Sequence, residues 1–253
     1  MNRVFQREPM ILALAVVMLA LFVVCVLLAA VDPRLITGVN AWFKPAKFTL
    51  SVAIYLFTVA CLLSPLERGL PGLAAARRTV AVAMAGEIAI IVLQAARGVP
   101  SHFNNSTPLN AVLFAIMGIL ILANTLAAAW ILWLYWSDAP ALKAPLLLGI
   151  RLGLGIFIVA GLQGFLMVAN GAHTVGAPDG ARGIFFVNWS LTNGDLRIAH
   201  FLGLHALQGL PVVAWLSGSR KAVIGVAAGW ALVFLVTLAV ALLGRPLLTP
   251  PAG

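Results

Sequence analysis

The chain has 253 residues, of which 62% are hydrophobic and only 9% are charged. Soluble domains carry charge on roughly a quarter of their residues, and a water-soluble fold needs more polar surface than this chain supplies. The composition therefore excludes a soluble enzyme, a disordered chain and a nucleic-acid-binding domain. The net charge of +9 does not favour nucleic acid, because the basic residues lie mostly between apolar segments, where anionic lipid headgroups are the simpler partner.

Seven segments are apolar enough to cross a hydrocarbon layer, which takes about 20 residues. They are Met10–Val31, Phe48–Ser64, Thr79–Ala96, Asn110–Trp136, Leu146–Ala169, Ile198–Ser217 and Ala222–Leu243. The connecting segments are short, and the longest runs only from about Asn170 to Arg197. We therefore expect an all-α integral membrane protein, with seven transmembrane helices in one bundle that forms a single domain over residues 1–253, and no soluble domain.

The distribution of Lys and Arg predicts the orientation in a cell (inner) membrane. With a cytoplasmic N-terminus, nine basic residues face inwards and seven face outwards, which favours N-in and C-out. The inner set is Arg3, Arg7, Arg68, Arg77, Arg78, Lys143, Arg151, Arg220 and Lys221. The outer set is Arg34, Lys44, Lys47, Arg97, Arg182, Arg197 and Arg245.

The first, third and fifth loops must lie on one side of the membrane, and all four histidines fall at that face. They are His102, His173, His200 and His205. Imidazole is a good ligand for zinc, copper and iron, so we expect a polar pocket at this face that binds a metal ion or haem b. Lys44, Lys47 and Arg97 at the same face are candidates for pairing with haem propionates.

His200 and His205 are five residues apart, or about 140° around a helix, so they do not form a facial metal pair. Of the four histidines, His205 is the best candidate to point inwards, and we expect it to share a pocket with His102 or His173. A hydrogen-bonded structural histidine is the alternative for each. Asp195, just before the sixth segment, has two interpretations: it caps that helix, or it acts as a ligand or base.

A second candidate is Glu87, about nine residues from either end of the third segment. A carboxyl group at that depth is costly and is a functional-site hypothesis by default. Buried amides would extend a polar track from Glu87 to the histidine face, or would simply join helices by hydrogen bonds. These amides are Gln94, Asn124, Gln163 and Asn170. We also expect Glu87 to pair with Arg151, whose alternative is to reach the inner headgroups.

Two pairs of glycines four residues apart, Gly149/Gly153 and Gly225/Gly229, permit close helix packing. Contacts within the chain are the favoured interpretation, and a homo-oligomer is the alternative.

Three functional classes remain. The first is a metal- or haem-binding protein with a redox or hydrolytic role, using His102, His173, His200, His205 and Asp195 at the non-cytoplasmic face, where a small molecule would bind. The second is a small-molecule or proton-coupled transporter that uses Glu87. The third is a non-catalytic assembly or sensory subunit. A retinal protein is excluded because the seventh segment has no lysine, and the His200–His205 spacing departs from the H-x-x-x-H pair of seven-span zinc hydrolases.

Overall fold

The structure, a computed structural model, describes residues 2–180 and 183–248. Within these ranges, seven helices are long and apolar enough to cross a membrane. They are α2 (Pro9–Val31), α3 (Phe43–Leu63), α4 (Leu73–Ala96), α5 (Pro108–Ser137), α6 (Ala144–Asn170), α7 (Leu196–Ser217) and α8 (Arg220–Leu242). All seven predicted segments are therefore confirmed as helices, and the described residues contain no soluble domain. The predicted orientation stays a prediction, and Arg182, one of the charges on which it rests, lies outside the described residues.

The remaining regular elements are short. Helix α1 (Asn2–Arg7) precedes α2. Strands β1 (Leu35–Ile36) and β2 (Val39–Asn40) form an antiparallel hairpin between α2 and α3. Strands β3 (Thr174–Val175) and β4 (Gly194–Asp195) pair across the long connection between α6 and α7.

All seven long helices in the described residues begin before their predicted segments, and for α3 and α4 the difference reaches five and six residues. Helix α3 begins at Phe43, so Lys44 and Lys47 lie in its first two turns and not in a loop. Helix α4 begins at Leu73 and includes Arg77. Hydropathy identifies the part of a helix that suits hydrocarbon, whereas the backbone hydrogen-bond ladder continues where the side chains become polar.

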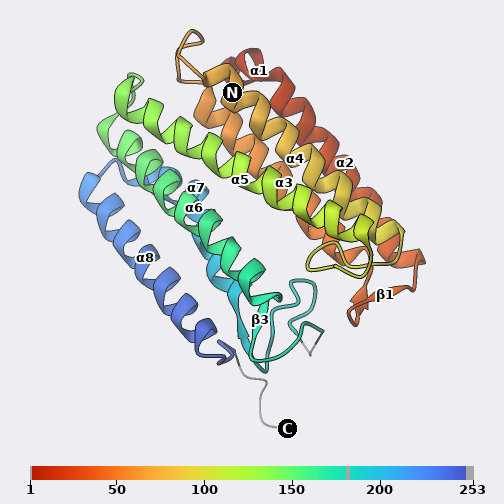
Figure 1. The fold of residues 1–253 in the computed structure, drawn as a ribbon. Coiled ribbons are helices and arrows are strands. Elements are labelled where there is room, and N and C mark those ends of the chain that lie inside the picture. Colours follow the sequence, from red (N-terminus) through yellow and green to blue (C-terminus); the bar gives the residue numbers. More distant parts are fainter. Residues whose placement is uncertain (1, 181–182, 249–253) are drawn as a thin grey trace. The chain divides into compact units, whose positions relative to one another are not determined.

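The chain divides into two compact units, residues 1–131 and residues 132–253. The first unit holds α1 to α4 and most of α5, and the second holds the end of α5 with α6, α7 and α8. Figure 1 shows α2, α3 and α4 side by side within the first unit, and α6, α7 and α8 within the second. The prediction of a single domain stays a prediction, and each unit is described by itself.

In the first unit, an ion pair fastens the start of α2 to α4. Arg77 donates from Nε and Nη2 to the two carboxylate oxygens of Glu8, at 2.7 and 2.8 Å. Arg7 donates to the carbonyl groups of Ser64 and Leu66 after α3. The chain bends at Glu8 because Pro9 begins α2 and has no N–H to continue the hydrogen bonds of α1. These contacts hold α2, α3 and α4 together at this end of the unit.

In the second unit, glycines bring α6 and α7 into close contact. A Cβ atom added to Gly149 would lie 2.8 Å from the Leu210 carbonyl oxygen, and one added to Gly153 would lie 2.8 Å from that of Ala206. Packing within the chain, the favoured interpretation of this pair, is confirmed. Gly225 and Gly229 on α8 differ, because a Cβ at either would meet no atom within 4 Å.

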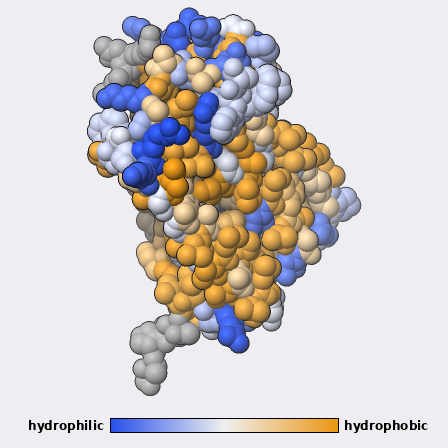
Figure 2. All heavy atoms as spheres, turned by 90° about the vertical axis from the view of Figure 1, so that its left-hand side faces the viewer, coloured by the Kyte–Doolittle hydropathy of each residue, from blue (hydrophilic) through white to orange (hydrophobic). Residues whose placement is uncertain are grey.

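Large apolar side chains remain exposed along the spanning helices, as expected for surfaces that face lipid. On the face drawn in Figure 2, apolar side chains cover broad areas, and hydrophilic ones gather mainly beyond them. Leu232, Val233 and Val236 of α8 each expose about half or more of their surface.

Candidate functional site: buried polar groups

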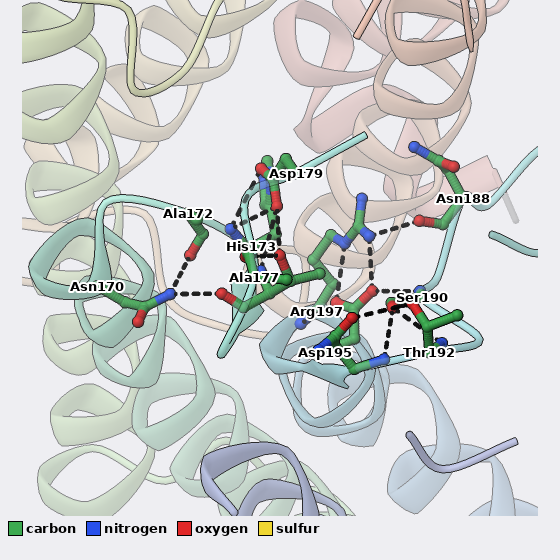
Figure 3. Close-up of polar contacts among 12 residues, drawn as sticks. Asn170, Ala172, His173, Ala177, Asp179, Asn188, Ser190, Thr192, Asp195 and Arg197 are labelled. Carbon is green, nitrogen blue, oxygen red and sulfur yellow. Dashed lines mark hydrogen bonds and ion pairs between the residues drawn. The ribbon is translucent and has the colours of Figure 1, made fainter. Parts of the chain in front are cut away.

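The connection between α6 and α7 contains a polar network around Asp195 (Figure 3). Asp195 is buried and precedes α7, and its carboxylate accepts from the backbone N–H of Arg197 at 3.0 Å and of Ser190 at 2.7 Å. The Arg197 guanidinium group donates to both carboxylate oxygens, at 2.9 and 2.6 Å, and also to the Asn188 carbonyl oxygen. The capping role foreseen for Asp195 is confirmed, and its catalytic role stays a prediction.

Asp179 organises the other half of this connection. Its carboxylate accepts from the backbone N–H groups of His173 and Thr174 and from the Thr174 hydroxyl group, and Oδ2 lies 2.5 Å from His173 Nδ1. Burial raises the pKa of Asp179, but the hydrogen bonds and the charge of His173 outweigh burial and hold this pKa below its ordinary value. His173 is therefore bound to a carboxylate that also fixes the loop backbone.

His200 and His205 have separate partners on α6 and α7. The Nδ1 of His200 lies 2.8 Å from the Ala160 carbonyl oxygen, to which it donates. His205 hydrogen-bonds Gln208 and packs its ring against Phe201, with 4.2 Å between centroids. These contacts match the alternative interpretation, in which a histidine is held by hydrogen bonds.

His102 belongs to the first unit and lies among aromatic rings. Its ring centroid is 5.9 Å from that of Phe48, 6.1 Å from Phe103 and 6.0 Å from Phe114. Its Nδ1 is 3.1 Å from the Ser101 hydroxyl oxygen. The pocket expected to join His205 to His102 or His173 stays a prediction.

The expected metal site receives no support from these contacts. Within residues 2–180 and 183–248, no three His, Cys, Asp or Glu side chains are grouped so that they could hold a metal ion. The physical reason is that each histidine contacts a different neighbour. The neighbours are Asp179 for His173, Ala160 for His200, Gln208 for His205 and the Phe48 ring for His102. A shared membrane face, deduced from helix alternation, does not bring side chains together.

The three residues foreseen as partners of haem propionates have other contacts. Lys44 places its ammonium group 5.8 Å from the Phe48 ring centroid. Arg97 donates from Nη1 to Gln94 Oε1 at 2.5 Å and to Asn110 Oδ1 at 3.0 Å. Lys47 lies one turn after Lys44 in α3. Haem therefore gains no support from these residues.

The buried amides of the first unit form hydrogen-bonded groups at two levels. Near the end of α4, Gln94 Nε2 donates to Asn110 Oδ1 at 3.1 Å, and Asn110 Nδ2 donates to Ser106 Oγ at 3.0 Å. Deeper in the unit, the Tyr55 hydroxyl group donates to Asn124 Oδ1 at 2.9 Å. The sequence pattern identifies Gln94 and Asn124 as buried amides but not Tyr55 and Asn110 as their partners. Tyr55 looks like any aromatic residue of an apolar segment, and Asn110 looks like a residue at the start of a helix.

In the second unit, Gln163 Nε2 lies 3.4 Å from the Leu196 carbonyl oxygen. Asn170 Nδ2 donates to the carbonyl oxygens of Ala172 and Thr174, which closes the end of α6. Both amides therefore join neighbouring segments, as the structural interpretation predicts.

Glu87 differs from the other buried acids. It is 4% exposed, and among the described residues its Oε1 has no hydrogen-bond partner. Glu8 and Asp195 are similarly buried, but an arginine donates to both oxygens of each. Glu87 is thus the buried acid in the described chain that lacks such a clamp.

The predicted pairing of Glu87 with Arg151 joins residues of different units and stays a prediction. Arg151 donates from Nε and Nη2 to the Tyr135 carbonyl oxygen, at 2.9 and 2.6 Å. Its guanidinium carbon lies 4.0 Å from the Trp136 ring centroid. Arg151 therefore already has two partners at the end of α5.

Comparison of the chain with family models, curated proteins and solved structures finds no match.

Proposed function

We propose that this protein is a cation-coupled membrane transporter in which the Glu87 carboxyl group binds and releases the coupling cation. The observation that supports the proposal is the burial of Glu87 in a helix long and apolar enough to cross a membrane, with Oε1 unpaired among the described residues. A buried ionised carboxylate without a partner is costly. Glu8, which has a structural role in the same unit, avoids that cost through Arg77.

The position of Glu87 suits this role. It lies nine residues before the end of α4 at Ala96, or about 14 Å along the helix axis. The Gln94–Asn110 group lies towards that end, and the Tyr55–Asn124 pair lies deeper in the same unit. A cation that binds at Glu87 therefore has polar groups both before and after it along its path.

The orientation that accompanies this proposal is N-in and C-out in a cell membrane. It would put Arg97, and His102 with the aromatic rings around it, at the non-cytoplasmic surface. A small solute would then enter from that side. Histidine-based metal or haem chemistry is not part of the proposal, because each histidine side chain is held by contacts of its own.

The proposal is tested by reconstitution of the purified protein into vesicles that contain a mixture of small metabolites. Imposed gradients of H⁺, Na⁺ and K⁺ are followed with ion-sensitive dyes. We expect one gradient to dissipate faster than in empty vesicles, and Glu87→Gln to remove the difference. Glu67→Gln, in the loop before α4, is the matched control and should transport like the wild type. Equal dissipation by wild type and Glu87→Gln would contradict the proposal.

A further inference from the structure

We propose that the coupling cation bound by Glu87 is a proton and not a metal ion. This inference rests on the proposed function and specifies its ion. It follows from the ligands that surround Glu87, from the apolar layer beside it, and from the hydroxyl group deeper in the unit.

The ligands near Glu87 do not suit a metal ion. Sodium, calcium and similar hard cations need several oxygen ligands around one point, whereas a proton needs a single lone pair. On the face of α4 that carries Glu87, the buried neighbours one turn away in either direction are Ala83, Met84, Ile90 and Ile91. These side chains contribute no oxygen atoms, and the described residues contain no group of three or more His, Cys, Asp or Glu side chains that could hold a metal ion.

An apolar layer separates Glu87 from the polar group at the end of α4. Ile90, Ile91 and Met117 form one buried cluster, against which Phe48 and Leu113 pack. Ile90 and Ile91 lie between Glu87 and Gln94 along the helix, so the layer occupies the interval between them. A hydrated metal ion must lose its water to cross such a layer, which is costly for an ion. A proton can cross the same layer by transfer along a chain of a few water molecules.

Deeper than Glu87 along the helix axes, the first polar side chain of α3 is that of Tyr55. Tyr55 lies 12 residues after Phe43, or about 18 Å along α3, compared with about 14 Å for Glu87 along the antiparallel α4. The Tyr55 hydroxyl group donates to Asn124 Oδ1 at 2.9 Å. A hydroxyl group is by its chemistry both a donor and an acceptor of hydrogen bonds, whereas one neutral phenol is a poor metal site.

Few charged groups face Glu87 from the elements of its unit. Lys44 on α3 acts on it electrostatically. Arg77 and Arg78 lie ten and nine residues before it in α4, and Arg97, the residue after α4, lies ten residues after it, each about 14 to 15 Å along the axis. The spanning segments of α2 and α5 contain no charged residue. The surrounding charge is positive and opposes the binding of any cation at Glu87, so the choice of a proton rests on the ligands and on the apolar layer.

The test is the reaction of Glu87 with dicyclohexylcarbodiimide, an apolar reagent that adds to protonated carboxyl groups. The full-length protein is treated in proteoliposomes, and labelled peptides are measured by mass spectrometry. We expect Glu87 to be labelled, and the rate to fall reversibly as the pH rises. NaCl, KCl or MgCl2 in place of choline chloride should leave the rate unchanged. Glu87→Gln is the control that must lose the label.

A metal ion that bound the same carboxylate would compete with the reagent. At ten times its Kd, such an ion would slow labelling about 11-fold by mass action. Slowing by Na⁺, K⁺ or Mg²⁺ would overturn the proton assignment while leaving transport through Glu87 intact. Labelling that is absent at every pH, in protein that still dissipates an ion gradient through Glu87, would overturn it as well.

Discussion

The ion pair between Glu8 and Arg77 gives a quantitative test of how the first unit is held together. The Glu8 side chain is 1% exposed and that of Arg77 is 20% exposed. Arg77→Met leaves the Glu8 carboxylate buried without its two donors, and removing one partner of a buried pair costs about 3–5 kcal/mol. Glu8→Gln should cost less, about 1–3 kcal/mol, because the partly exposed guanidinium group can still reach water.

The double variant Glu8→Gln/Arg77→Met removes both charges and should be more stable than the sum of the single effects predicts. We expect a coupling energy of about 1–3 kcal/mol. The free energy of unfolding is measured by circular dichroism during titration with a denaturing detergent. Arg78→Met, at the exposed neighbouring position, is the control and should change stability by about 0.5 kcal/mol or less. Single effects that add within about 0.5 kcal/mol would refute the reasoning.

Three further predictions concern the loops and the second unit. Because the folded-state pKa of Asp179 is lowered, its stabilisation of the α6–α7 connection is present above the ordinary value of about 4 and is lost as the pH falls through the folded value. The Thr174 amide should therefore lose protection in acid, measured as its hydrogen-exchange rate relative to the intrinsic rate at the same pH, and Asp179→Asn should remove this dependence. Gly153→Ala should lower the free energy of unfolding by about 1–3 kcal/mol because its Cβ would meet the Ala206 carbonyl oxygen. Gly155→Ala, with nothing within 4 Å, should leave that free energy unchanged or raise it by up to about 1 kcal/mol. Equal losses of the two variants in thermal denaturation would contradict this packing. Single cysteines at positions 69 and 193, placed in a Cys25→Ala/Cys61→Ala background, test the orientation. In intact cells an impermeant thiol reagent should label only the cysteine at 193. Labelling at 69 alone would show that the predicted orientation is wrong.

The sequence predicts the helices of this protein well because hydrocarbon imposes a simple rule on them. A segment such as Met10–Val31 has no alternative to a helix in a bilayer, since every backbone polar group must be satisfied internally. Helix starts are harder to predict. Phe43 begins α3 five residues before the apolar stretch, and nothing in the hydropathy of Lys44 and Lys47 distinguishes a polar first turn from a loop.

Side-chain partners are predictable only where they are local. The cap by Asp195 follows from its place just before a helix, and the structure confirms it. The Glu8–Arg77 pair joins residues 69 apart, and the four histidines have partners set by packing, so neither arrangement could be deduced from spacing. For Glu87, burial follows from its place in an apolar segment, but the lack of a partner at Oε1 became visible only once the described side chains had been placed around it.

The most direct test of the central claim is an infrared titration of the protein in lipid. Glu87 should give a carboxylic acid C=O band that is missing in Glu87→Gln, and this band should disappear reversibly as the pH rises and shift on transfer to D2O, because the group exchanges its proton with water. A Glu87 band that is absent at every pH, or that neither titrates nor exchanges, would contradict the claim that Glu87 binds and releases a proton.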